Sequence, residues 1–277
     1  MFFLKLKYFL HYYKSKALKK RCKKDYASQK KIFEEKLDHK NFSQKWFLNN
    51  FEIFTFFLPK DKSSKFDYLE VGCYEGLSSF YVLSEYKFVN AFFLDIWDMP
   101  NPNSKTLSTN FDLIEKAFDQ NLSGFNFKKI KNDSVISMRK LLKENVHFDF
   151  IYIDGSHNGE DILSDAIEAF KILKVNGLMF FDDFLQHDDN RILQSYVGID
   201  KFLSLYSDYL KIEYFQNNLV VRKKWNISGE VAEWLKAHAW KACKGVTLSW
   251  VRIPFSPPQI IFILCGQFDI FYELVKL

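Results

Sequence analysis

The chain has 277 residues, of which 48% are hydrophobic and 18% aromatic, enough to form the core of one large domain with short extensions. Its formal net charge is only +5, and the basic residues gather in the first third, so the charge does not predict a nucleic-acid partner. Four cysteines (Cys22, Cys73, Cys243, Cys265) lack metal-binding spacing and are too few for a disulfide framework, which favours a reducing, cytoplasmic setting.

The N-terminal stretch, residues 1–24, mixes aromatic residues with lysines. The mixture is too polar for a secretory signal or a membrane span. Two interpretations stay open: a basic amphipathic helix that contacts an anionic membrane or a partner, and a solvated helix that packs its aromatic stripe on the domain. We favour the second interpretation and treat residues 1–60 as a helical extension.

From Phe66 onward, short apolar runs alternate with longer mixed segments, which indicates βα units and a mainly parallel sheet. A helix at 199–207 and a hairpin at 209–224, turning at Asn217 and Asn218, should follow. The predicted fold over residues 61–227 is therefore α/β, a Rossmann-like doubly wound sheet with a C-terminal antiparallel hairpin and helices on both faces. The strands are predicted at 66–72, 91–97, 125–131, 148–154 and 177–183, and the helices between them at 76–86, 110–120, 134–143 and 159–173.

Residues that end the predicted strands are the most informative, because open parallel sheets bind ligands at the carboxyl ends of their strands. The first strand ends in "LEVGCYEG", which holds Glu70, Gly72 and Gly76. Gly72 permits a tight turn, and the helix after it offers unpaired amides. The stretch lacks the G-x-G-x-x-G of dinucleotide-binding folds, so an uncharged or zwitterionic ligand is favoured. Asp95, on the second strand, can accept hydrogen bonds from ribose hydroxyls.

The third strand runs into Asp133 and Ser134 at the start of a predicted helix. Two interpretations of Asp133 are compatible: it caps the helix N-terminus, or it bonds an adenine amino group.

Three carboxylates follow neighbouring strands: Asp154 after the fourth, and Asp182 with Asp183 after the fifth. They would repel one another in a partly dehydrated cleft, and a divalent cation resolves that repulsion. Oxygen ligands favour a hard cation such as Mg²⁺. His157, three residues after Asp154, is then a candidate general base, although a histidine near a helix start is more often structural.

These motifs resemble the class I S-adenosylmethionine-dependent methyltransferases, in the branch of the macrolide sugar O-methyltransferases and cephalosporin hydroxylase-like proteins. The resemblance covers roughly residues 68–224 and is most specific in "YIDGSH", Asp165, "LKVNG" and "FFDD". Asn176 stands where the family usually has a second glycine, and asparagine tolerates the left-handed conformation.

The resemblance also implies roles for the strand-end residues. Glu70, Gly72 and Gly76 would surround the methionine and ribose of the cofactor, Asp95 would hold the ribose, and Asp133 with Ser134 would flank the adenine. Asp154, Asp182 and Asp183 would bind Mg²⁺, and His157 would accept the acceptor's proton.

The tail, residues 228–277, differs abruptly in composition and holds three of the six tryptophans (Trp234, Trp240, Trp250). "GEV" and "PFSPP" can be encoded by segments that pair as an acceptor stem, and "HAWKAC" by an anticodon arm. "WVRI" can be encoded by TGG GTT CGA ATC, which contains a TTCGAAT loop. We hypothesise that the tail is a serine transfer-RNA gene translated in frame, and we assign it no function.

The sequence thus predicts a magnesium-assisted O-methyltransferase for a hydroxyl of a sugar, glycoconjugate or small molecule. Two alternatives stay open: a nicotinamide-dependent reductase, and a non-catalytic cofactor-binding scaffold at a membrane or glycan-assembly complex. Homo-oligomer formation is compatible with the sequence. The acceptor is expected to contact residues 41–59, which include Trp46, and the loop 97–108.

Overall fold

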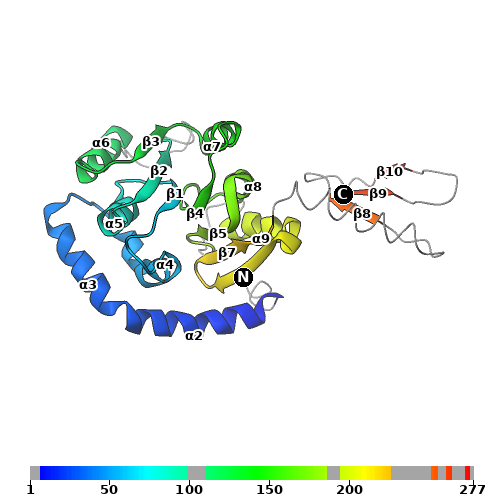
Figure 1. The fold of residues 1–277 in the computed structure, drawn as a ribbon, viewed down its shortest axis with the longest axis horizontal. Helices are drawn as coiled ribbons and strands as arrows, with labels where there is room; N and C mark the ends of the chain where they lie inside the picture. Colours follow the sequence, from blue (N-terminus) through cyan, green and yellow to red (C-terminus); the bar gives the residue numbers. More distant parts are fainter. Residues whose placement is uncertain are drawn as a thin grey trace.

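The computed structural model describes residues 7–98, 110–185 and 194–225, together with three short strands between residues 251 and 274. A seven-stranded sheet forms the centre, in the order β3-β2-β1-β4-β5-β7-β6 (Figure 1). The first five strands run parallel, and β7 and β6 are antiparallel to their neighbours. The predicted fold class and the C-terminal hairpin are confirmed. The strands are β1 (Phe66–Val71), β2 (Val89–Asp95), β3 (Lys128–Lys131), β4 (Phe148–Ile153), β5 (Leu173–Phe181), β6 (Leu210–Phe215) and β7 (Leu219–Lys223).

Helices cover both faces of the sheet because alternate residues of the buried strands point in opposite directions. On β4, Phe150 and Tyr152 belong to one apolar cluster, while Ile151 and Ile153 belong to the other. The first cluster includes side chains of α4 (Phe51–Phe57), α5 (Leu77–Glu85) and α6 (Phe111–Asn121), and the second those of α7 (Ser134–Lys143), α8 (Gly159–Ile172) and α9 (Ser195–Leu205).

The helix α8 is amphipathic. Ile162, Ala166, Ala169 and Phe170 are buried at helical spacing against the sheet. Asn158 caps the helix by accepting a hydrogen bond from the Glu160 amide.

The bounds of three strands differ from the prediction by two or more residues. β2 ends at Asp95, because the Trp97 amide donates to the Asp95 carboxylate and the chain turns there. β3 begins only at Lys128, and Phe127, just before it, packs on Phe93. β5 begins at Leu173, four residues earlier than predicted, as Lys174 forms ion pairs with Asp67 and Asp149 at the amino ends of β1 and β4.

The N-terminal extension forms a helical arm around one side of the sheet (Figure 1). It consists of α2 (Phe9–Asp25), α3 (Ala27–Glu35), the 3-10 turns η1 (Lys36–His39) and η2 (Trp46–Asn49), and α4. Phe33, Phe47, Phe51 and Phe54 are buried in the first apolar cluster. The extension therefore contributes to the core of the domain.

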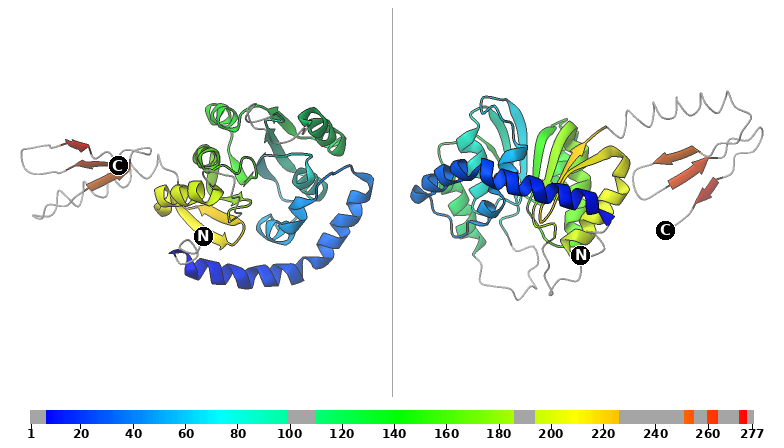
Figure 2. Two further views of the ribbon diagram at one scale, coloured as in Figure 1. Left: turned by 180° about the vertical axis from the view of Figure 1, so that it is seen from behind. Right: turned by 90° about the horizontal axis from the view of Figure 1, so that it is seen from below.

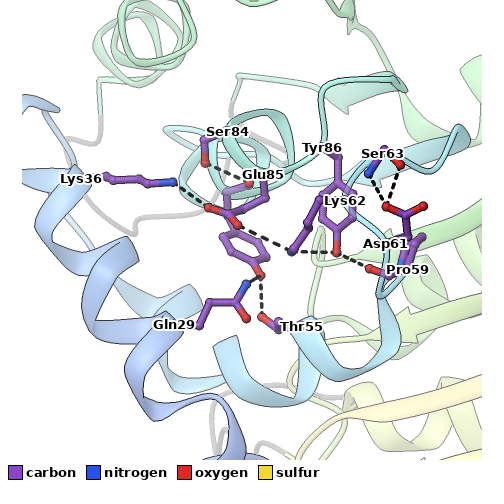
Figure 3. A network of polar contacts seen from close by, with 11 residues as sticks. Gln29, Lys36, Thr55, Pro59, Asp61, Lys62, Ser63, Ser84, Glu85 and Tyr86 are labelled. Carbon is purple, nitrogen blue, oxygen red and sulfur yellow. Dashed lines mark hydrogen bonds and ion pairs between the residues drawn. The ribbon is translucent and has the colours of Figure 1, made fainter.

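Polar contacts also fasten the arm to α5 (Figure 3). Lys36 of η1 pairs with Glu85 at 2.7 Å, and Lys62 pairs with the same carboxylate at 3.6 Å. The Gln29 amide donates to the Tyr81 hydroxyl, which also bonds Thr55. The arm is thus held to the domain by both apolar and polar contacts.

The remaining described elements are the 3-10 turn η3 (Ser207–Tyr209) and a separate antiparallel sheet of β8 (Val251–Pro254), β9 (Ile260–Ile263) and β10 (Tyr272–Leu274). The rest of the tail lies outside the described residues, so its transfer-RNA origin stays a hypothesis. No helix among the described residues is both long and apolar enough to cross a membrane.

Candidate active site

Two positions in the turn after β1 require glycine. Gly72 has a φ of 85°, and a Cβ there would lie 2.2 Å from the Asp154 carbonyl oxygen. Gly76 has a φ of 83° and is the N-cap of α5, where a Cβ would lie 2.8 Å from the Phe118 ring. Gly72 thus allows the turn to approach the end of β4, and Gly76 allows the start of α5 to approach α6.

Asp95 organises this turn from the neighbouring strand. Its Oδ2 accepts hydrogen bonds from the Cys73 and Tyr74 amides at 2.7 and 2.9 Å, and its Oδ1 accepts one from the Trp97 amide at 2.8 Å. A carboxylate has about four acceptor positions, so capacity for a ribose hydroxyl remains on Oδ1. The predicted ribose contact therefore fits one oxygen of Asp95.

Glu70 has no exposed surface. Its carboxylate accepts hydrogen bonds from the hydroxyls of Tyr68, Ser78 and Ser79, and burial raises its pKa to about 7. In this arrangement Glu70 ties β1 to the first turn of α5. Its predicted contact with the cofactor stays a prediction.

Asp133 caps α7: its carboxylate accepts a hydrogen bond from the Ile136 amide at 2.9 Å. Ser134 donates its hydroxyl to Asp165, a buried residue of α8 whose pKa burial raises to about 6. The capping interpretation is confirmed, while the adenine contact stays a prediction for both residues.

Several residues at the carboxyl edge of the sheet have a strained backbone with positive φ. Among the described non-glycine residues, Tyr74, Trp97, Asp183, Asn145 and Asn176 have positive φ. Asn145 lies in the turn after α7 and Asn176 lies within β5, both away from the cluster, and asparagine tolerates this conformation. Tyr74, Trp97 and Asp183 instead follow β1, β2 and β5 at their carboxyl ends, where strained residues are typical of functional sites.

An acidic cluster lies between the ends of β4 and β5. One potential ligand atom from each of Asp154, His157 and Asp183 lies within 4.8 Å of the others. The Ser195 hydroxyl donates to the His157 carbonyl oxygen at 2.8 Å and so fixes the loop that carries the imidazole. The structure therefore brings together three of the four residues predicted for metal binding and proton transfer.

The cluster is electrostatically unfavourable without a cation. Burial raises the pKa of Asp154 well above its usual range, and the charges of Asp182, Asp183 and Glu70 raise it further. Burial also raises the pKa of Asp183. No lysine or arginine forms an ion pair with these two carboxylates in the described part of the chain. A hard divalent cation would compensate this charge, so the residues fit the predicted metal.

Asp182 is bound differently. It is 7% exposed, and its oxygens accept hydrogen bonds from the Asn50 amide at 2.7 and 2.8 Å and from the Tyr152 hydroxyl at 2.6 Å. The Asn218 side chain and the Asp183 amide donate to it as well. Little acceptor capacity remains for a metal, so the geometry favours a positioning role over the predicted ligand role.

Three contributors to this site carry no local sequence signal. Asn50 belongs to the N-terminal extension, Asn218 to the β6–β7 turn, and Tyr152 to the interior of β4. Each donates to Asp182 from a distant part of the chain. Asn218 was predicted as a turn residue, but nothing in the sequence links that turn to the acidic pair.

An aromatic pair borders the same edge. Trp46 of η2 is 61% exposed, and its ring centroid lies 5.3 Å from that of Tyr74. The Ser43 amide donates to Glu75 at 2.6 Å, and Asn50 bonds Asp182. The segment 43–50 therefore spans the edge from the glycine turn to the acidic pair.

Comparison with solved structures gives several similar folds. The MycE methyltransferase from the mycinamycin biosynthetic pathway, in complex with Mg and SAH, has a TM-score of 0.45 and 15% identity, covering 66% of this chain and 51% of its own. The O-methyltransferase from Bacillus cereus, in complex with SAH, has a TM-score of 0.47 and 11% identity, covering 77% and 99%. The N-methyltransferase NodS from Bradyrhizobium japonicum WM9 has a TM-score of 0.39 and 13% identity, covering 57% and 86%.

This chain therefore spans about half the length of MycE. All three TM-scores are below 0.5. No curated protein matches the sequence at a significant level. A family model described as a methyltransferase domain matches residues 69–184, the part that runs from β1 through the acidic pair. Residues 69–184 of this chain thus match a methyltransferase domain.

Proposed function

We propose that this protein is an O-methyltransferase that uses a divalent cation and acts on a hydroxyl of a sugar, glycoconjugate or small molecule. The observation that carries the proposal is the cluster of Asp154, His157 and Asp183 beside the glycine turn of the methyltransferase domain. The cluster combines a site for a hard cation with a histidine that can accept a proton.

Asp154 and Asp183 are the proposed metal ligands, because Mg²⁺ prefers oxygen and is commonly held by one or two carboxylates together with water. Such an ion would lower the pKa of a bound acceptor hydroxyl. Asp182, with its oxygens already hydrogen-bonded, orients Asp183 through the backbone and Tyr152 through its hydroxyl.

His157 is the proposed general base. It takes the proton of the acceptor hydroxyl as the new carbon–oxygen bond forms and the carbon–sulfur bond of the sulfonium breaks. The products are the methylated acceptor, S-adenosylhomocysteine and protonated His157. The glycine turn and Asp95 position the methyl donor, so alignment of donor and acceptor supplies much of the rate.

Trp46 and Tyr74 are proposed to contact the acceptor. The exposed indole offers an apolar face, and the Ser43 and Tyr74 hydroxyls, 3.4 Å apart, offer polar partners beside it. A molecule with both ring faces and hydroxyl groups, such as a sugar, suits this combination.

Calorimetric titration of S-adenosylmethionine into the full chain tests the cofactor, and titration of Mg²⁺ tests the metal. His157→Ala should keep both binding events and lower methyl transfer by a factor on the order of 10² to 10⁴. His147→Ala, at the opposite end of the sheet, is the matched control and should keep full activity. If His157→Ala loses Mg²⁺ binding, the histidine is a ligand and the base assignment is wrong; if S-adenosylmethionine does not bind the unmutated chain, the cofactor assignment fails.

The scaffold alternative predicts that cofactor binding occurs without methyl transfer to any hydroxyl acceptor. The reductase alternative is less favoured, since the glycine turn differs from the dinucleotide-binding pattern and the family match is to methyltransferases.

A further inference from the structure

The helix α2 has one buried side and one exposed side. Tyr8, just before the helix, packs on Phe215 in a tilted arrangement with ring centroids 4.9 Å apart. Ser15 accepts a hydrogen bond from the Phe215 amide at 2.8 Å, and Cys22 has no exposed surface. These contacts bind α2 to the edge strand β6 and to the core. The helix therefore packs on the domain, but the predicted packing of its aromatic stripe is only partly correct, because Tyr8 contacts the domain while Phe9 and Tyr13 are exposed.

The other side of α2 carries a dense positive charge. The helix contains seven basic side chains and one acidic one, a formal charge of +6. The whole chain has a formal charge of +5, so all remaining residues together carry −1. Among the described residues, the exposed Lys14, Lys16, Lys20, Lys23 and Lys24 have no ion-pair partner. The attraction for an anionic surface is thus concentrated on this helix.

Large apolar side chains are exposed at the beginning of the same helix. Phe9, Leu10 and Tyr13 are 50%, 69% and 54% exposed, and the rings of Phe9 and Tyr13 contact each other with centroids 4.6 Å apart. Figure 2 shows α2 along the outside of the domain, with no other described element over its outward side. Aromatic and aliphatic groups next to lysines are typical of helices that lie in a membrane interface.

The apolar end of α2 lies at the same edge of the sheet as the active site. β6 runs parallel to β5, because both are antiparallel to β7, so Phe215 marks the carboxyl edge. Asn217 and Asn218 in the next turn contact Leu185 and Asp182. Contact of Phe9, Leu10 and Tyr13 with a surface would therefore bring the reacting edge close to that surface.

We propose that the exposed side of α2 binds an anionic phospholipid surface, with Phe9, Leu10 and Tyr13 entering the interface and the lysines contacting the head groups. Nucleic acid or an acidic protein would be attracted by the lysines, but neither accounts for a Leu10 that is 69% exposed beside two exposed rings. A lipid interface satisfies both features. It would also give the enzyme access to acceptors held at the membrane.

Sedimentation of the full chain with vesicles tests the proposal. We expect binding to mixed phosphatidylglycerol and phosphatidylcholine vesicles, weak binding to phosphatidylcholine alone, and a decrease with salt. Each basic side chain near the surface contributes about fivefold in affinity, so replacing both Lys20 and Lys24 with glutamine should weaken binding by about 25-fold. Phe9→Ser with Leu10→Ser should weaken it by at least tenfold, since apolar area leaves the interface.

The matched control removes the same charge elsewhere. Lys140→Gln with Lys143→Gln, on the exposed side of α7, should leave vesicle binding unchanged. Equal losses in the α2 and α7 variants would mean that net charge alone drives binding and would overturn the proposal. Unchanged binding after Phe9→Ser with Leu10→Ser would do the same and would indicate a purely anionic partner. The unfolding midpoint of each variant confirms that it is folded.

Discussion

The two edges of the central sheet differ in whether their charged side chains form ion pairs. At the amino edge, Lys174 forms ion pairs with Asp67 and Asp149. At the carboxyl edge, Asp154, Asp182 and Asp183 have no cationic partner among the described residues. An edge whose charges are balanced within the protein is structural, whereas an edge with uncompensated carboxylates indicates a ligand.

The largest expected effect comes from the glycine turn. Gly72→Ala places a Cβ 2.2 Å from the Asp154 carbonyl in a backbone that alanine disfavours, so we expect a loss of roughly 4 kcal/mol in the free energy of unfolding. Gly124→Ala is the control: its φ is 88°, but nothing lies within 4 Å of the new atom, and a loss of only about 1 kcal/mol is expected. Urea unfolding measures both, and equal losses would show that close approach to β4 is unimportant.

Two buried ionisable groups, one near each edge, should give opposite pH dependence. The pKa of Glu70 is raised from 4.5 to about 7 by burial, so its charged form destabilises the fold: stability is full below pH 4.5 and falls as the pH rises to about 7. The pKa of Lys223 is lowered from 10.5 to about 8 by burial, so stability rises as the pH increases from about 8 to 10.5.

Urea unfolding across pH measures these slopes. Glu70→Gln should remove a loss of about 3 kcal/mol on the acidic side, and Lys223→Met should remove the alkaline gain. A Glu70→Gln variant with the same slope as the unmutated chain would contradict the assignment of that titration to Glu70.

Two asparagine–aspartate pairs extend the comparison. Asn50 donates to the buried Asp182 at the carboxyl edge, and Asn90 donates to Asp67 at the amino edge at 2.7 Å. Asn50→Leu should cost about 1–3 kcal/mol in unfolding free energy and lower the turnover number, because a buried carboxylate loses its donor. Asn90→Leu, on the surface, should cost less than about 0.5 kcal/mol. If Asn50→Leu has an unchanged turnover number, Asp182 does not act as a positioning residue.

Replacing the exposed tryptophans at the two edges should have the smallest effect on the free energy of unfolding. Trp46→Ala should raise the KM for the acceptor about three- to tenfold, with a change in unfolding free energy within about 0.5 kcal/mol. Trp225→Ala, which removes a residue that is 55% exposed beyond β7, should change neither. If both variants leave the KM unchanged, the acceptor lies elsewhere.

The fold and the positions of the strand-end residues could be predicted from the sequence, because apolar alternation and strand-ending carboxylates are local signals. Asp154, His157 and Asp183 meet as predicted for neighbouring parallel strands. Asn50 and Asn218 could not be found in this way, since their contacts with Asp182 join segments 132 and 36 residues apart and leave no local pattern. The early start of β5 likewise depends on ion pairs to two other strands.

Binding of Mg²⁺ to the full chain, measured by calorimetry, tests most directly whether the carboxyl edge is a cation site. The account predicts one site in the unmutated protein, its loss in Asp183→Asn, and its retention in Asp149→Asn, which removes a carboxylate already paired with Lys174. Absence of binding in the unmutated chain, or equal binding in the two variants, would contradict the proposed role of the acidic cluster.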